Sequence, residues 1–175
     1  AKKINMYNKE IKILLSLSLT AGSAYLFANG EIGYGILVIL LIALVVLSIF
    51  RNERIILAFY HLRKNNMPKA QLALEKIKHP EKLVRSQEAY FYYLKALILS
   101  QTQMNKAEKF FKKALTIGLR TDSDQAVAKL NLAGLAMSRR RKREATTLLS
   151  DAKKLDKHNM LDDQINMMKQ QLKRI

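Results

Sequence analysis

Residues 91–115 read FYYLKALILSQTQMNKAEKFFKKAL and contain two helical patterns joined by a short polar stretch. Apolar residues recur at intervals of three and four, as at Leu94, Leu97 and Ile98. This spacing places apolar side chains on one face of a helix. After residue 50 no useful length alternates apolar and polar residues, and glycine and proline are scarce. The sequence therefore predicts an all-α fold.

The same pattern returns at a nearly constant interval. Ala70, Ala107 and Ala145 are separated by 37 and 38 residues, and a leucine precedes each alanine by thirteen residues. Further apolar residues follow each alanine four and seven positions later. The marks around the three alanines are Leu57, Leu74 and Ile77, then Leu94, Phe111 and Ala114, then Leu132, Leu149 and Ala152. Such a period is typical of stacked helical repeats, in which small residues let two helices cross closely.

Local signals divide this region further. Thr121 with Asp124 resembles a capping box at a helix start, and Gly118 is a candidate helix stop. Ala126 is expected near the solvent at the start of that helix. The final stretch, 160–175, places Leu161, Ile165, Met168 and Leu172 on one face. It is predicted to be a capping helix that closes an open repeat stack.

The units resemble the tetratricopeptide repeat family, best in residues 91–115 and in 130–155, LNLAGLAMSRRRKREATTLLSDAKKL. Each repeat of the family has a leucine, a small residue, a large apolar residue and a final alanine at fixed positions. In the two units these positions are occupied by Leu94, Ala107, Phe111 and Ala114, and by Leu132, Ala145, Leu149 and Ala152. The likeness covers about residues 52–156, but Lys95 replaces a small residue, and the spacing exceeds the family's 34 residues.

The resemblance implies an α-solenoid of about three helix pairs with a concave groove. It places Tyr92, Ala96 and Leu99 in that groove. Tyr92 and Ala96 occupy positions where some members carry the lysine and asparagine that clamp a C-terminal carboxylate. A clamp of that kind is therefore not expected here.

Two uncharged apolar stretches precede the repeats, at 13–28 and 33–50. As helices they would extend roughly 24–27 Å, close to the thickness of a hydrocarbon core. We therefore expect residues 1–50 to form a transmembrane helical hairpin and 51–175 a separate repeat domain. Small residues spaced by four, Ser16, Thr20, Ala24 and Ala28, are expected to pack either on the second helix or on another membrane protein.

Basic residues would orient such a hairpin. Lys2, Lys3, Lys9 and Lys12 precede the first stretch, Arg51, Arg54, Arg63 and Lys64 follow the second, and the connection between the stretches carries none. The positive-inside rule then predicts a multi-pass protein of a bacterial-type inner membrane with both termini in the cytoplasm. The helix of the first repeat is expected either to continue the second stretch or to follow it after a bend.

The chain is strongly basic, with a formal net charge of +17. Residues 1–50 hold four of the 31 basic and two of the 14 acidic residues, which leaves +15 for 51–175. Cations gather at Arg139, Arg140, Arg141, Lys142 and Arg143 and at Lys109, Lys112 and Lys113. This concentration predicts an anionic partner, namely lipid headgroups, a ribosomal RNA surface or an acidic protein.

Nothing in the sequence indicates catalysis. The chain has no cysteine, its three histidines are far apart, and no glycine-rich phosphate loop occurs. We therefore predict no enzyme activity, no metal, no cofactor and no small-molecule substrate. The predicted function is a membrane-anchored adaptor or scaffold, an accessory subunit of a membrane protein complex. The alternative is a protein that recruits ribosomes, RNA or anionic lipid, for example at a site of protein translocation or insertion.

Overall fold

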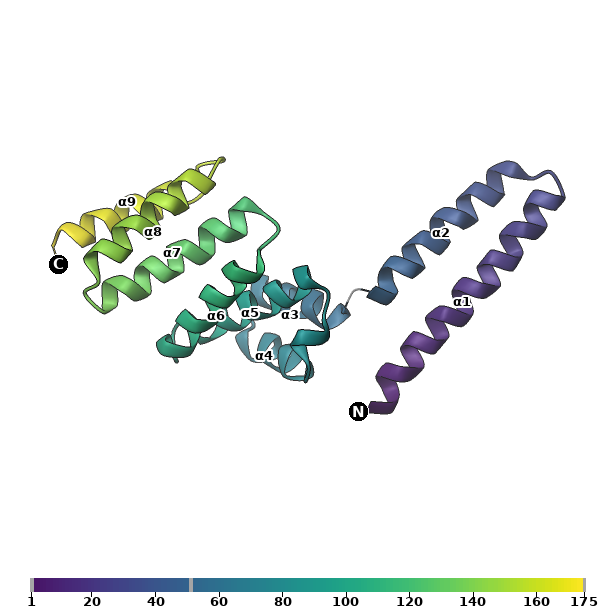
Figure 1. The fold of residues 1–175 in the computed structure, drawn as a ribbon, viewed down its shortest axis with the longest axis horizontal. Helices are drawn as coiled ribbons and strands as arrows, with labels where there is room; N and C mark the ends of the chain where they lie inside the picture. The colour runs from purple at the N-terminus through teal and green to yellow at the C-terminus, as the bar shows by residue number, and fades with distance from the viewer. Residues whose placement is uncertain (1, 51, 175) are drawn as a thin grey trace. The chain divides into compact units, whose positions relative to one another are not determined.

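The computed structural model describes the backbone of residues 2–50 and 52–174, and the side chains of residues 11, 13–45 and 52–174. This part of the chain is all-α, as the sequence predicts, with nine α-helices, one short 3-10 turn and no strand (Figure 1). In chain order the elements are α1 (Lys2–Ala28), α2 (Ile32–Phe50), α3 (Glu53–Arg63), α4 (Met67–Glu75), η1 (Pro80–Lys82), α5 (Arg85–Leu99), α6 (Met104–Ile117), α7 (Asp122–Ser138), α8 (Lys142–Leu155) and α9 (Asp162–Lys173).

The fold divides into two compact units between Asn52 and Glu53. The first holds α1 and α2, and the second holds α3 to α9. Helices α2 and α3 are separate, since α2 ends at Phe50 and α3 begins at Glu53.

The first unit is an antiparallel hairpin of two helices (Figure 1). Its turn needs Gly30, which has a φ of 78°. The amide of Gly30 donates to the carbonyl of Phe27 at 3.1 Å, and the amide of Glu31 donates to that of Leu26 at 3.0 Å. These bonds form a Schellman motif that satisfies the last carbonyls of α1 and reverses the chain.

The hairpin packs along a face that differs from the predicted small-residue stripe. Thr20, Ala24 and Ala28 are exposed, and only Ser16 of that set is half-buried. The least exposed positions of α1 are instead Ser16, Leu19, Ser23 and Leu26. Steps of four residues drift by about 40° each around a helix, so a strict four-residue stripe rotates away from a single partner. Alternating steps of three and four stay on one side.

The prediction of a transmembrane hairpin is wrong. Over the residues described, no helix has both the length and the apolar character that crossing a bilayer requires. Helix α1 has 27 residues, but charged residues occupy its first part, and its uncharged end, 13–28, is shorter than the roughly 20 apolar residues that a transmembrane helix needs.

The predicted inner-membrane localisation depended on those two spans and is therefore wrong as well. The side chains of Lys2, Lys3, Lys9 and Lys12, and all of Arg51, lie outside the described residues.

The second unit is a helical repeat-like stack. Helices α3 and α4, α5 and α6, and α7 and α8 form the three predicted pairs, and α9 packs on the last pair (Figure 1). Ala70, Ala107 and Ala145 are fully buried, as the period predicts. The larger marks Leu74, Phe111 and Leu149 are buried beside them. The sequence period therefore corresponds to the period of the packing.

One position of the repeat pattern differs from the prediction. Leu57 is 48% exposed, whereas the equivalent Leu94 and Leu132 are buried. Helix α3 buries Ile55 and Ala58 instead. The reason is position in the stack: α5 packs against helices on both sides within this unit, whereas α3 is the first helix and leaves one face uncovered.

The predicted helix boundaries are confirmed. The Thr121 side chain caps α7 by accepting from the amide of Asp124 at 3.1 Å, and Gly118 ends α6 at a φ of 107°. Helix α9 buries Ile165 and Leu172 against the stack, as predicted for a capping helix. Ala126 is fully buried, which contradicts the expected exposed position, because the start of α7 lies within the stack.

Candidate anion-binding surface

The five consecutive cations do not share one environment. Helix α7 ends at Ser138 and α8 begins at Lys142, so Arg139, Arg140 and Arg141 form the turn. Lys142 and Arg143 are the first residues of α8. Arg140 has a φ of 56°, a left-handed conformation that lets the turn reverse between the helices.

Glu108 on α6 neutralises part of this run. Its carboxylate accepts from Nη1 of Arg139, from Nη1 of Arg141 at 3.2 Å and from Nζ of Lys112 at 2.7 Å. The Glu108 side chain is only 13% exposed. The hydrogen bond from Lys112, supported by the two arginines, holds the pKa of Glu108 below its ordinary value.

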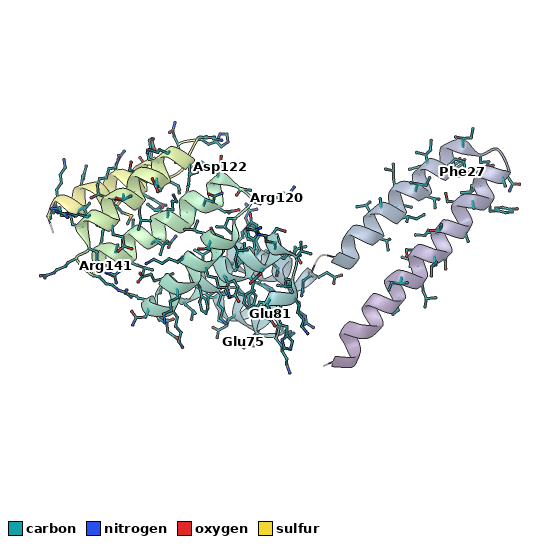
Figure 2. All side chains as sticks on the ribbon, viewed as in Figure 1. Phe27, Glu75, Glu81, Arg120, Asp122 and Arg141 are labelled. Atoms are coloured by element: carbon teal, nitrogen blue, oxygen red, sulfur yellow. The ribbon has the colours of Figure 1, made fainter. Side chains whose placement is uncertain are left out.

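Glu144 extends the same network. It pairs with Arg141 at 3.2 Å and with Lys112 at 3.5 Å. Two carboxylates therefore bind three of the eight predicted anion-binding cations. These ion pairs connect α6 to the α7–α8 turn, in which Arg141 is labelled in Figure 2. These cations are engaged in stabilising the stack, so they are poorly available to a partner. We call Glu108, Glu144, Lys112, Arg139 and Arg141 the Glu108 network.

Lys113 is also engaged. Its Nζ donates to the hydroxyl of Tyr92 at 2.7 Å, lies 4.0 Å from the centre of that ring, and approaches Glu88 at 4.0 Å. The hydrogen bond to Tyr92 raises the pKa of Lys113. A cation held over an aromatic face in this way is stabilised by the ring quadrupole.

The residues predicted to line a groove lie inside the α5–α6 packing. Tyr92 is 8% exposed and stacks on Phe110, and Ala96 is fully buried. Leu99 is half-buried. Burial likewise raises the pKa of the neighbouring Tyr90 to about 12, and the Tyr90 hydroxyl donates to Asp124 at the start of α7. The tyrosine cluster therefore joins helices of the stack.

The remaining predicted cations are exposed. Lys109, Arg140, Lys142 and Arg143 form no ion pair with any described residue. They lie on α6, in the α7–α8 turn and on the first turn of α8. The eight predicted residues thus separate into a paired set that holds the fold and an unpaired set that faces solvent.

Acidic side chains of the second unit are largely used within the fold. Asp151 pairs with Lys129, Asp162 with Lys153, and Asp122 with Lys157. Asp156 is buried and accepts from the amides of Met160 and Leu161, which shapes the α8–α9 turn. The exposed charge that remains is therefore predominantly positive.

Sequence reasoning did not identify Glu108 and Glu144 as the counter-charges. Glu108 and Arg139 are 31 residues apart, so no local pattern connects them. The repeat period does connect them, because it brings α6 beside the turn of the next pair. The same reasoning also missed Lys169 and Lys173 on α9, although their spacing of four on a capping helix places them on one face.

Nδ1 of His79 lies 3.0 Å from Oε1 of Glu81. Among the described residues no three histidine or acidic side chains gather as metal ligands would. Comparison with protein-family models, curated proteins and solved structures finds no match to this chain.

Proposed function

We propose that this chain is a helical-repeat adaptor, similar to tetratricopeptide proteins, whose second unit binds an acidic segment of a partner protein. The observation that carries the proposal is the imbalance of available charge. The second unit, residues 53–175, holds 26 basic and 12 acidic residues, a net charge of +14, and most of its acids are bound to its own cations or amides. An approaching acidic chain therefore meets exposed cations with few competing carboxylates.

The unpaired set supports a protein partner better than RNA. Proteins that bind single-stranded RNA commonly stack bases on exposed aromatic side chains. Tyr92 and Phe91 beside the basic region are buried in the stack. Lys109 offers a point charge, and the guanidinium groups of Arg140 and Arg143 offer paired N–H donors. With no aromatic ring beside them on which a base could stack, these groups suit the carboxylates of a peptide.

The test compares two triple variants of the full chain. Changing Lys109, Arg140 and Arg143 to glutamine removes three unpaired charges. At about 0.2–1 kcal/mol for each exposed pair, binding of a fluorescein-labelled glutamate-rich peptide should weaken roughly three- to hundred-fold. The thermal unfolding midpoint should barely move, since exposed substitutions usually cost little.

The matched control changes Lys112, Arg139 and Arg141 to glutamine, which removes the same charge from the Glu108 network. This variant should lose stability because Glu108 keeps a partly buried charge without partners. Peptide binding measured where the variant remains folded should fall less than in the unpaired triple. Equal loss in both triples would contradict the assignment of the surface.

A salt series and an RNA competitor complete the test. Peptide binding should weaken as the salt rises from about 0.05 to about 0.5 M, because exposed charges are screened. If a single-stranded RNA of equal charge binds more tightly than the glutamate-rich peptide, the partner is RNA and not an acidic protein. No peptide binding at low salt would contradict the proposal.

A further inference from the structure

A cleft between α8 and α9 joins three lysines to an apolar floor. It has a volume of about 410 Å³ and is lined by Lys142, Thr146, Leu149, Lys169, Leu172 and Lys173. Lys142 begins α8, whereas Lys169 and Lys173 lie in the last turns of α9. The start of α8 and the end of α9 therefore meet at the same end of the stack.

The cleft carries positive charge without an internal counter-charge. No acidic side chain lines it, and Lys142, Lys169 and Lys173 form no ion pair with any residue of the described chain. The nearby Glu144 is held by Arg141 and Lys112. The Thr146 hydroxyl already donates to the carbonyl of Lys142 at 2.9 Å. The ammonium groups are thus the side-chain donors available to a ligand, and an anion would relieve their mutual repulsion.

The apolar surface of the cleft is aliphatic. Leu149 is fully buried and Leu172 is 7% exposed, so the methylene stems of the three lysines supply most of that surface. The described residues that line the cleft include no aromatic side chain. The volume lies within the range of roughly 300–1,000 Å³ that is usual for ligand sites. Without an aromatic surface a nucleic-acid base has nothing on which to stack. A ligand with carboxylates around a large aliphatic side chain matches both the rim and the floor.

We propose that this cleft, the lysine cleft, binds an acidic peptide segment of a partner protein. A large aliphatic side chain of the segment packs on Leu172 and on the methylene stems of the lysines. Its carboxylates accept from Lys142, Lys169 and Lys173. This inference rests on the proposed function, since it names the site at which the chain recognises an aliphatic side chain of its acidic partner in addition to the partner's charge. The unpaired cations outside the cleft attract the partner, and the lysine cleft selects its sequence.

The experiment uses the full chain and three fluorescein-labelled peptides of equal length. The first has a leucine flanked by two glutamates on each side, the second has glycine for that leucine, and the third has glutamine for the glutamates. We expect the leucine peptide to bind at least fivefold more tightly than the glycine peptide, and the glutamine peptide to bind weakest. Equal binding of the leucine and glycine peptides would overturn the lysine cleft.

Two triple variants localise the binding. Changing Lys142, Lys169 and Lys173 to glutamine should weaken the leucine peptide at least tenfold and abolish its advantage over the glycine peptide. The matched control, with Lys69, Lys78 and Lys106 changed to glutamine, removes the same charge from exposed positions outside the cleft. It should weaken both peptides equally and only slightly. Far-UV circular dichroism and the unfolding midpoint check that both triples remain folded.

The outcomes separate this inference from the proposed function. If both triples weaken binding alike while the acidic peptides still bind the wild type, the lysine cleft is wrong and the adaptor function stands. If the wild type binds none of the acidic peptides at low salt, both are wrong.

Discussion

The α1–α2 hairpin and the repeat unit use similar apolar side chains with opposite results. In the hairpin Leu14 is 64% exposed and Tyr25 is 70% exposed, whereas in the repeat unit Leu94 and Phe111 are fully buried. A helix with one partner buries one narrow face, but a helix inside a stack is covered from several sides. Burial therefore depends on how many neighbours a helix has, as well as on its composition.

The largest expected effect tests this difference directly. Phe111→Ala removes a fully buried ring and should lower the free energy of unfolding of the repeat unit by about 3–5 kcal/mol. Leu14→Ala in the hairpin removes an exposed side chain and should change the stability by less than about 0.5 kcal/mol. Native-state hydrogen exchange followed by mass spectrometry reports each unit separately in the full chain. Similar losses of protection would mean that the hairpin buries Leu14.

A second pair of variants sharpens the comparison at small residues. Ala107→Leu and Ala145→Leu each insert a larger side chain at a fully buried crossing and should cost about 1–3 kcal/mol. Ala24→Leu makes the same change at an exposed position of α1 and should be nearly neutral. The measurement is the shift of the denaturant midpoint for amides of the affected helices. An equal cost at Ala24 would show that the predicted small-residue stripe packs after all.

The sequence predicted the repeat unit better than the hairpin for a physical reason. A period of 37 or 38 residues repeats the same crossing, so Ala70, Ala107 and Ala145 report the packing of three units together. Leu57 has the right spacing but lies on the first helix, where no preceding pair covers it. Periodicity identifies equivalent positions, but it does not tell which equivalents lie at the end of a stack.

Local sequence patterns did not predict the Glu108 network or the character of the hairpin. The five-cation run suggested a single anion-binding turn, whereas Glu108, 31 residues from Arg139, pairs with part of it. Only the three-dimensional stack separates the paired cations from the unpaired ones. In the hairpin the run of apolar residues suggested a membrane span, but no helix over the described residues is both long and apolar enough to cross a membrane.

A third prediction concerns the Glu108 network. Hydrogen bonding to Lys112 lowers the pKa of Glu108 below its ordinary value of 4.5. A lowered folded-state pKa contributes stability that is complete above the unfolded value and is lost as the pH falls through the folded value. Glu108→Gln should therefore cost about 1–2 kcal/mol at pH near 6 and progressively less below pH 4.5. The difference in unfolding midpoint between wild type and variant, measured across this range, checks the sign.

The control for this prediction is Asp163→Asn. Asp163 is exposed and has no ion pair among the described residues. Replacing this exposed side chain should change the unfolding midpoint much less than Glu108→Gln does. A pH-independent cost for Glu108→Gln would mean that its role is packing rather than charge.

The smallest expected effect lies in the hairpin and compares two glycines. Gly22, inside α1, has no atom within 4 Å of the position where a Cβ would stand. Because glycine weakens a helix interior, Gly22→Ala should stabilise the hairpin by about 0.5–1 kcal/mol. At Gly35 in α2 the added Cβ would meet the ring of Phe27 at 2.7 Å (Figure 2 labels Phe27 near the hairpin turn).

Phe27 is 40% exposed, so its ring has room to move towards solvent. Gly35→Ala should therefore gain helix propensity and lose the contact with Phe27, with a net change smaller than that of Gly22→Ala. Hydrogen exchange of the α1 and α2 amides measures both variants. If Gly35→Ala stabilises the hairpin as much as Gly22→Ala does, the Phe27–Gly35 contact contributes nothing to stability. The hairpin would then depend on Ser16, Leu19, Ser23 and Leu26 for its packing, and the contrast with the repeat unit would be greater still.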